Sequence, residues 1–324
     1  MRALVAGAGG FIGGHLVNRL ESLGIEVLAI DIKKIEDWFQ LPKGAAPISA
    51  NLSLRENCFS LTENVDLVFN LAADMGGMGF IESNKAKCME SVLINTHLLQ
   101  AAVKNGISKF FYSSSACVYA SWHQNSLEVL PLKEQDAYPA DPEDGYGWEK
   151  LFSERMCRHF LEDYGLKTRV ARYHNVYGPF GTYDGGREKA PAAACRKVYK
   201  AIKDKTFSIE IWGDGNQLRS FTYIDDCIDG TILLSNSRVE SPINIGSSET
   251  ISIKSLYETI IVNLGFETEQ FQFNYNLTAP QGVRGRSSDN TKCLETLNWT
   301  PSISVSSGIM KTYEWICKDI EDNK

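Results

Sequence analysis

The chain has 324 residues, of which 43% are hydrophobic and 23% are charged, a composition typical of a soluble globular protein. Its formal net charge of -7 at pH 7 and its pI near 5.4 argue against a surface built to bind nucleic acid. The apolar runs are too short to cross a bilayer and none near the start is patterned like a signal peptide. We therefore expect a cytoplasmic enzyme with no membrane partner.

The first half of the chain alternates short apolar segments with amphipathic ones. This alternation is typical of a doubly wound parallel sheet with helices on both faces. A glycine or an Asn-Gly pair ends two of the amphipathic segments, as is common at helix C-termini. We expect strands over residues 3–6, 26–31, 65–73 and 109–115, and helices over residues 15–23, 91–104 and 144–164.

The regular alternation breaks down beyond Arg172, where glycine-rich turns occur at 178–181 and 213–215. Such a change of pattern indicates a second, smaller domain. Strand-like segments at 219–224 and 242–246 are expected to return the chain to the first sheet. We therefore predict an α/β protein with two discontinuous domains. The Rossmann-type domain comprises residues 1–171 with 219–246, and a smaller mixed α/β substrate-binding domain comprises residues 172–218 with 247–324.

A glycine-rich turn, Gly7-Ala8-Gly9-Gly10-Phe11-Ile12-Gly13, lies between the first expected strand and the first expected helix. Glycine permits a tight turn and a close approach of the backbone to a pyrophosphate, which the N–H groups at the helix start then bind. Asp31 ends the second expected strand, where a carboxylate binds the ribose of a dinucleotide. Because Asp31 would repel a 2′-phosphate, NAD is favoured over NADP. Lys33 and Lys34 are interpreted as surface charges.

Tyr146 and Lys150 lie four residues apart in one expected helix, so their side chains share a face. The ammonium is expected to favour the phenolate and to lower the pKa of Tyr146, as a general base requires. Ser115, at the end of an expected strand, can complete the hydrogen bonds around a substrate hydroxyl. Cys117 adds a second possible base. The pattern indicates an enzyme that oxidises an alcohol and also moves another proton.

The eight cysteines are scattered and contain no Cys-x-x-Cys pair. In a large intracellular α/β chain this distribution favours free thiols over disulfides. The five histidines and the cysteines show no zinc-binding spacing. We therefore expect no catalytic metal.

Together these features resemble the extended short-chain dehydrogenases/reductases, a superfamily that includes the nucleotide-sugar epimerases and dehydratases. Three longer strings resemble the signature of the GDP-mannose 3,5-epimerases: NLAADMGGMGF at 70–80, GGREKAPAA at 185–193 and VRGRSSDN at 283–290. The resemblance runs from Gly7 to about Trp315, nearly the whole chain. It implies NAD as the cofactor and a GDP-sugar, with GDP-mannose favoured, as the substrate.

The resemblance also implies a mechanism in which hydride passes from C4 of the sugar to NAD+. Tyr146, assisted by Lys150 and Ser115, would take the proton of the C4 hydroxyl. The resulting ketone acidifies the hydrogens at C3 and C5, where Cys117 corresponds to the base of the family. Lys189 corresponds to its partner acid on the opposite face. A proton removed by one residue and returned by the other inverts the carbon, and return of the hydride restores the alcohol.

Basic and backbone groups are expected to hold the two ligands, because Lys and Arg suit a diphosphate and Arg can bind two of its oxygens. Arg284 is an alternative to Arg286 that spacing alone does not exclude. Gly76 would let the backbone approach the sugar. The cofactor is expected against Gly7, Gly10, Phe11, Ile12, Gly13, Asp31, Asn51, Leu71, Tyr146 and Lys150, and the GDP-sugar against Gly76, Ser115, Ala116, Cys117, Asn175, Glu188, Lys189, Lys197, Gln217, Arg219 and Arg286.

The chain departs from the family pattern at three places. Asn51 stands where the family has an Asp near the adenine, but its carbonyl can still accept a hydrogen bond. The segments 122–130 and 201–209 also differ from the family norm, which leaves the substrate preference open.

Other functions remain compatible with these residues. An enzyme that inverts one carbon only, or that uses a GDP-heptose or a deoxysugar, fits equally well, and a 4-epimerase or dehydratase is a further alternative. A catalytically silent dinucleotide-binding scaffold is disfavoured because the five candidate catalytic residues Ser115, Cys117, Tyr146, Lys150 and Lys189 occur together. The resemblance also predicts a homodimer formed through the helices at 91–104 and 146–164.

Overall fold

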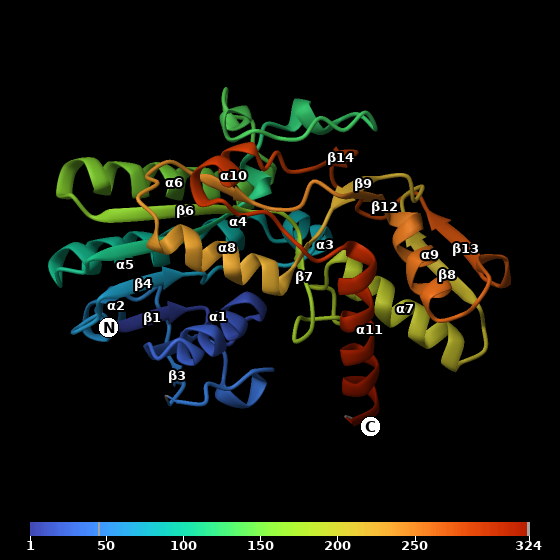
Figure 1. The fold of residues 1–324 in the computed structure, drawn as a ribbon, viewed down its shortest axis with the longest axis horizontal. Helices are drawn as coiled ribbons and strands as arrows, with labels where there is room; N and C mark the ends of the chain where they lie inside the picture. Colours follow the sequence, from blue (N-terminus) through green and yellow to red (C-terminus); the bar gives the residue numbers. More distant parts are fainter. Residues whose placement is uncertain (45, 323–324) are drawn as a thin grey trace.

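The structure is a computed structural model and describes residues 1–44 and 46–322. A seven-stranded parallel sheet with the order β11-β6-β5-β4-β1-β2-β3 forms its centre (Figure 1). Because β1 pairs with both β2 and β4, the strand order reverses beside β1, which confirms the expected doubly wound α/β fold. The strands are β1 (Arg2–Ala6), β2 (Glu26–Asp31), β3 (Ile48–Ser49), β4 (Leu67–Asn70), β5 (Lys109–Ser115), β6 (Lys167–Tyr173) and β11 (Ile243–Ile245).

Helices cover both faces of this sheet, and alternate residues of each strand point into two separate cores. Ala3 and Val5 of β1 belong to the core shared with α1 and α8, whereas Leu4 and Ala6 belong to the core shared with α2, α5 and α6. The helices are α1 (Phe11–Ser22) and α8 (Ile224–Asn236) on one face, and α2 (Arg55–Leu61), α5 (Val92–Lys104) and α6 (Asp144–Tyr164) on the other.

A second layer lies beside the carboxyl ends of the strands, at the right of the view in Figure 1. Its helices α7, α9 and α11 pack against one another next to two small sheets. The remaining α-helices and strands are α3 (Met78–Ser83), α4 (Lys85–Met89), β7 (Val176–Tyr177), α7 (Ala190–Lys203), β8 (Ser208–Trp212), β9 (Leu218–Ser220), β10 (Thr222–Tyr223), β12 (Thr250–Ser252), α9 (Ile253–Asn263), β13 (Gln272–Asn276), β14 (Gly285–Arg286), α10 (Thr291–Leu297) and α11 (Val305–Asp322). Among the short 3-10 turns, η2 (Ala116–Val118) follows β5 directly.

Most expected elements are present, with shifted ends. The first helix begins at Phe11 and not at His15, because the glycine turn already leads into it. The expected return of residues 219–224 to the large sheet is wrong. Here β9 pairs with β12 and β14, and β10 pairs with β7, so that only β11 rejoins the large sheet. The predicted domain boundaries stay a prediction.

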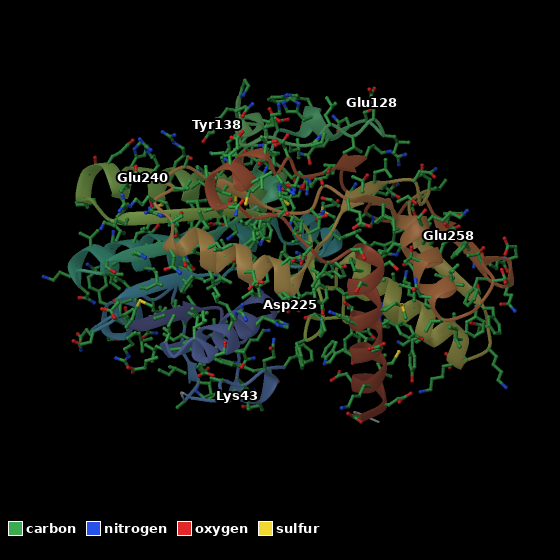
Figure 2. All side chains as sticks on the ribbon, viewed as in Figure 1. Lys43, Glu128, Tyr138, Asp225, Glu240 and Glu258 are labelled. Atoms are coloured by element: carbon green, nitrogen blue, oxygen red, sulfur yellow. The ribbon has the colours of Figure 1, made fainter. Side chains whose placement is uncertain are left out.

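Many charged side chains, such as Lys43 and Glu240, are exposed at the periphery of the molecule (Figure 2), whereas others, among them Lys150 and Arg286, are buried. In the described part of the chain, no helix combines the length and the apolar character that crossing a membrane requires.

We predict that Gly13→Ala destabilises the protein, because the added Cβ would overlap the backbone carbonyl of Gly7, which the sheet holds in place. Overpacking of this kind costs about 2 kcal/mol. Gly14→Ala is the matched control on the same helix, since its Cβ would meet the side chain of Gln40, which can move. Urea unfolding of both variants checks the prediction, and equal stabilities would contradict it.

Candidate active site

The turn between β1 and α1 is shaped by backbone contacts that only glycine allows. Gly7 has a φ of +85°, and a Cβ on it would lie 3.0 Å from the backbone of Leu71. Gly10 is the N-cap of α1 and has no side chain to bind the first N–H groups of the helix. The start of α1 therefore has no side-chain cap on its backbone N–H groups at the switch point of the sheet, while the indole of Trp38 packs against Gly9 in the same turn. These residues fit the pyrophosphate of a dinucleotide.

The acidic residue expected to bind the ribose lies at the end of β2, beside this turn. Asp31 is buried, and its Oδ1 accepts a hydrogen bond of 3.0 Å from the backbone N–H of Lys33. Lys33 is exposed, as expected, yet its Nζ also donates to the carbonyl of Gly9 at 3.1 Å. Asn51 uses its Oδ1 locally, because it accepts from the N–H of Ser53 at 2.9 Å.

Tyr146 and Lys150 meet beside the end of β5, as the sequence predicts. Lys150 Nζ lies 5.6 Å from the centre of the Tyr146 ring and donates to the carbonyl of Ser113 at 3.1 Å. The expected lowering of the Tyr146 pKa is wrong for this structure. Burial raises the pKa of Tyr146 well above its ordinary value, and Cys117 adds to this rise, whereas a hydrogen bond with Ser115 opposes it.

A buried carboxylate that the sequence analysis missed holds Lys150. Glu149 is 3% exposed, and its Oε2 lies 3.7 Å from Lys150 Nζ. Its Oε1 accepts hydrogen bonds from Tyr112 at 3.1 Å and from Ser153 at 2.8 Å. The position next to Lys150 is a signal in the sequence, but an acidic residue on a helix is usually solvated, and only the packing of α6 on β5 buries this one.

Cys117 lies in η2, directly after β5, and its thiol faces a buried guanidinium. Arg286 Nη1 lies 3.7 Å from Cys117 Sγ, and Arg286 Nε donates to Gln124 Oε1 at 2.5 Å. Arg286 Nη2 lies 2.8 Å from Glu143 Oε2. Burial is the main cause that raises the pKa of the Cys117 thiol, and the Glu143 carboxylate raises it further. Sequence reasoning missed both Glu143 and Gln124, which lie far from Arg286 along the chain.

Lys189 is the N-cap of α7 and approaches the same site from the second layer. Burial of its ammonium lowers the pKa of Lys189, although the residue as a whole keeps some exposure, and the nearby Cys117 thiol acts in the opposite direction. The hydrogen bonds and ion pairs of this loop run through Arg187, Glu188 and Arg196, and among the described residues none engages the Lys189 side chain. Its amine is therefore available to a ligand.

The loop that carries Lys189 is fastened to the Gly-Gly-Met loop after β4. The N–H of Gly77 donates to the carbonyl of Arg187 at 3.0 Å, and a Cβ on Gly77 would overlap the carbonyl of Glu188. Arg187 Nη1 donates to Asp74 Oδ1 at 2.7 Å. Gly76 was expected to admit a sugar, but here a Cβ on it would lie 3.2 Å from the Cα of Arg187. Gly76 and Gly77 therefore allow, before anything else, the close packing of these two loops.

The basic residues among the remaining candidates for substrate binding differ in how close they lie to Arg286. Arg219 lies close enough to Arg286 that the second positive charge adds to burial in lowering the pKa of Arg219 to about 10. Lys197 lies further out, where its Nζ donates to the carbonyl of Glu210 at 2.8 Å. Arg284 forms two hydrogen bonds with Asp214, at 3.1 and 3.0 Å. The structure therefore brings Arg286, and not Arg284, beside the thiol.

Two further residues of the predicted set bind the backbone of the second layer. Gln217 Nε2 donates to the carbonyl of Trp212 at 3.2 Å, and its Oε1 has no hydrogen-bond partner among the described residues. Asn175 Nδ2 donates to the carbonyl of Ser220 at 2.9 Å, and its φ of +41° lies in the left-handed region. Glu188 pairs with Arg196 at 3.0 Å, which helps to order the loop before α7.

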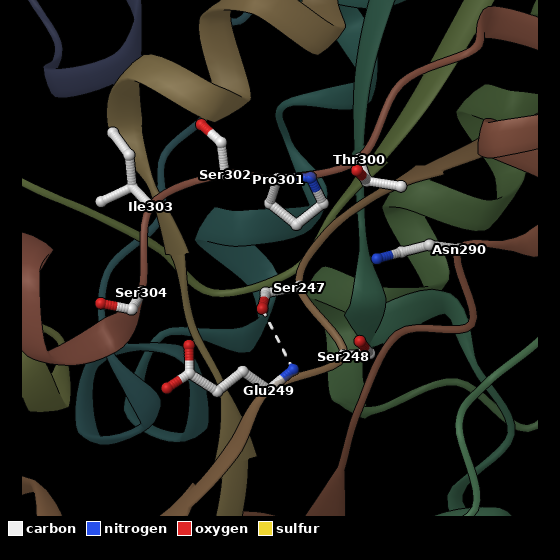
Figure 3. A pocket seen from close by; sticks show the side chains of 9 residues that line it. All are labelled: Ser247, Ser248, Glu249, Asn290, Thr300, Pro301, Ser302, Ile303 and Ser304. Carbon is white, nitrogen blue, oxygen red and sulfur yellow. Dashed lines mark hydrogen bonds between the residues drawn. The ribbon is translucent and has the colours of Figure 1, made fainter.

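An open cavity of about 340 Å³ lies elsewhere, between the chain after β11 and the start of α11 (Figure 3). Polar side chains that line this cavity already accept hydrogen bonds from neighbouring backbone N–H groups. Glu249 Oε2 accepts from the N–H of Val305 at 3.0 Å, and Ser247 Oγ accepts from the N–H of Glu249 at 3.1 Å. No residue of the predicted site lines this cavity, whose walls are Ser247, Ser248, Glu249, Asn290, Thr300, Pro301, Ser302, Ile303 and Ser304.

Known proteins share this sequence pattern. The model of the NAD dependent epimerase/dehydratase family matches residues 3–246. The chain is 46% identical over 325 residues to GDP-mannose 3,5-epimerase 1 of Oryza sativa subsp. indica, with 100% of this chain and 84% of that protein covered. It is 45% identical over 333 residues to GDP-mannose 3,5-epimerase of Arabidopsis thaliana, with the same coverage.

Solved structures share the fold. The UDP-glucose 4-epimerase of Thermotoga maritima, solved with UDP-glucose, has a TM-score of 0.87 at 26% identity and covers 99% of this chain and 100% of its own. The protein MoeE5, solved with UDP-glucose and NAD, has a TM-score of 0.80 at 26% identity, also over 99% of this chain and 100% of its own.

We predict that Lys189 titrates below the ordinary lysine value of 10.5, because burial disfavours its charged form. Lys254 is the control, since its ion pair with Glu258 at 3.3 Å raises its pKa. Competitive acetylation with acetic anhydride at a series of pH values, read peptide by peptide, gives both midpoints. A Lys189 midpoint at or above that of Lys254 would contradict the prediction.

Proposed function

The chain belongs to the NAD dependent epimerase/dehydratase family, and we propose that it is a GDP-mannose 3,5-epimerase that works through a transient 4-keto sugar. The observation that carries the proposal is the convergence of Tyr146, Cys117 and Lys189, from three different elements, on one buried site. The 46% identity over the whole chain supports the same activity.

Tyr146 takes the proton of the C4 hydroxyl in the proposed first step. Ser115 holds the phenol by a hydrogen bond, and the Lys150 ammonium lies over the ring at 5.6 Å, where its positive charge favours the phenolate. When bound, NAD+ supplies the acceptor for the hydride that leaves C4. The residues that would hold it are the glycine turn from Gly7 to Gly13, Asp31 and Lys150. The product of this step is a ketone at C4.

Cys117 and Lys189 then act on the carbons beside the ketone, whose hydrogens are acidic because the negative charge can spread onto the C4 oxygen. The thiolate of Cys117 removes a proton from one face of the ring. The ammonium of Lys189 returns a proton from the other face, which inverts the carbon. Arg286 supports the thiolate, since its Nη1 lies 3.7 Å from the sulfur. Return of the hydride to C4 restores the alcohol.

The GDP portion is proposed to lie along the second layer. Arg219 and Arg286 suit the diphosphate because a guanidinium can bind two oxygens at once. Both are held by the protein in advance, since Arg286 donates to Gln124 and Arg219 Nη2 donates to the carbonyl of Gln281 at 3.2 Å. Lys197 and Gln217 lie near Trp212 and are proposed to contact the nucleoside, together with Asn175.

We predict that Cys117→Ala abolishes solvent deuterium uptake at C3 and C5 of GDP-mannose but leaves some oxidation at C4. Loss of an acid–base residue lowers a rate by roughly 10²- to 10⁴-fold, and Tyr146 remains in place to oxidise C4. NMR of the products in heavy water measures the uptake, and the absorbance of the reduced cofactor measures the oxidation.

Cys88→Ala is the matched control, because Cys88 belongs to the same small core as Cys117 and Tyr146. It should keep the deuterium uptake within a few-fold of the original protein. Undiminished uptake in Cys117→Ala would show that another residue is the base. Wild-type protein that exchanges only one of the two carbons would identify a single-site epimerase.

We also propose that the protein is a homodimer formed through α5 and α6. Large apolar side chains are exposed along these helices and at the end of α4: Leu93 is 45% exposed, Trp148 47%, Phe152 57% and Met89 46%. Trp148 and Phe152 lie one helical turn apart on the same face of α6. An exposed apolar surface of this kind is typical of a protein–protein contact.

We predict that Phe152→Glu converts the dimer to a monomer, because it places a charge in the centre of this apolar surface. Size-exclusion chromatography with light scattering gives the mass. Leu233→Glu is the control, since Leu233 is 43% exposed on α8, on the opposite face of the sheet. A dimeric mass for Phe152→Glu, or a monomeric mass for the unmodified chain, would contradict the proposed interface.

A further inference from the structure

Glu143 is held next to Cys117 by the backbone at the start of α6. Its N–H donates to the carbonyl of Cys117 at 3.1 Å. A Cβ on Gly147 would overlap that same carbonyl, so the first turn of α6 lies directly on the Cys117 backbone. The Glu143 side chain is 11% exposed. The carboxylate is therefore fixed in the interior, beside the thiol, and not free to turn toward solvent.

The Arg286 guanidinium contacts both the Glu143 carboxylate and the Cys117 thiol. Arg286 Nη2 lies 2.8 Å from Glu143 Oε2, and Arg286 Nη1 lies 3.7 Å from Cys117 Sγ. Among the described residues, neither Arg286 Nη2 nor Glu143 Oε2 has a well-aligned hydrogen bond. The contact is thus an ion pair held by charge. Gln124 fixes the guanidinium from the far side, because its Nε2 donates to the carbonyls of Tyr119 and Ala120 and leaves its Oε1 for Arg286.

The charged groups that surround the Cys117 sulfur differ from those that surround the Lys189 side chain. The groups that face the thiol are Glu143 and Tyr146 on the α6 side, Arg286 on β14, Arg219 on β9, Lys189 before α7, and the Ser115 hydroxyl. Glu143 brings a carboxylate to the thiol, whereas Lys189 has no carboxylate within ion-pair distance among the described residues. A negative charge beside a thiol disfavours the thiolate.

We propose that Glu143 is a positioning residue for Cys117: by sharing Arg286 with the sulfur, its carboxylate keeps the proton on the thiol in the free protein. This inference deepens the proposed epimerase function and rests on it, because Cys117 must lose that proton before it can take one from the sugar. Glu143 thereby sets how high the pH has to be for Cys117 to act as a base. The direction agrees with the raised pKa of Cys117.

The test is the pH dependence of Cys117 alkylation by iodoacetamide in the protein without sugar, read by mass spectrometry of the Cys117 peptide. Only the thiolate reacts, so the midpoint reports the pKa of the thiol. Glu143→Gln removes the negative charge and keeps the shape of the side chain. We expect the midpoint to fall by about one pH unit, which raises the rate at neutral pH about tenfold. Arg286→Gln should shift the midpoint upward, because Arg286 favours the thiolate.

Asp144→Asn is the matched control. It removes the same charge one residue further along, where Asp144 pairs with Lys85 at 2.7 Å and not with Arg286. An unchanged midpoint in Glu143→Gln, or an equal fall in Asp144→Asn, would overturn the proposal. Because shifts of opposite sign are expected for Glu143→Gln and Arg286→Gln, general loosening of the structure cannot produce the expected result.

Two further measurements test the same proposal: a second substitution of Glu143, and the pH dependence of deuterium uptake. If Glu143→Gln does not fold, Glu143→Asp moves the carboxylate away from Arg286 and should change the midpoint in a folded protein, and no change overturns the proposal. In heavy water with GDP-mannose, the acid limb of deuterium uptake should move to lower pH in Glu143→Gln. Absence of turnover in the unmodified protein would refute the proposed function alone, since the alkylation is measured without sugar.

Discussion

The packing of the first turn of α6 on the end of β5 is the contact on which the whole candidate site depends. Gly147 makes it possible, because any side chain there would overlap the carbonyl of Cys117. With the two backbones this close, Tyr146 and Lys150 of α6 and its N-cap residue Glu143 all lie beside the sulfur or the end of the sheet. A small shift of α6 would separate Tyr146, the proposed alcohol-oxidising group, from Cys117, the proposed proton-moving group.

Burial dominates the electrostatics of the site. It raises the pKa of Cys117 and of Tyr146 and lowers that of Lys189, so burial shifts each group toward its neutral form. The charged forms that proton transfer needs must be supported by fixed partners. In the proposed mechanism Arg286 plays this part for the thiol and Lys150 for the phenol; Arg286 pairs with the half-buried Glu143, and Lys150 lies beside the buried Glu149. The candidate site therefore combines opposite charges in a largely buried environment, where each partner is expected to have a large effect.

The candidate site draws its residues from both layers of the molecule. The sheet layer provides the glycine turn, Cys117 and Tyr146, while the second layer provides Lys189 and Arg286. The loops that join them are fastened by contacts between backbones, as between Gly77 and Glu188, which is why glycine is required there. A ligand held between the layers can be approached from two faces, and inversion of a carbon requires this arrangement.

The parallel sheet, the glycine turn and the pairing of Tyr146 with Lys150 could be predicted from the sequence, because they depend on local periodicity and on residues close together in the chain. The sequence also pointed to Cys117 through its spacing from Ser115. Three features follow only from the folded chain: 219–224 lies outside the large sheet, Arg286 and not Arg284 faces the thiol, and Glu143 lies half-buried beside it. Strand partners and charge environments arise from contacts between distant segments, and burial, which reverses the expected pKa shift of Tyr146, exists only once those segments have packed.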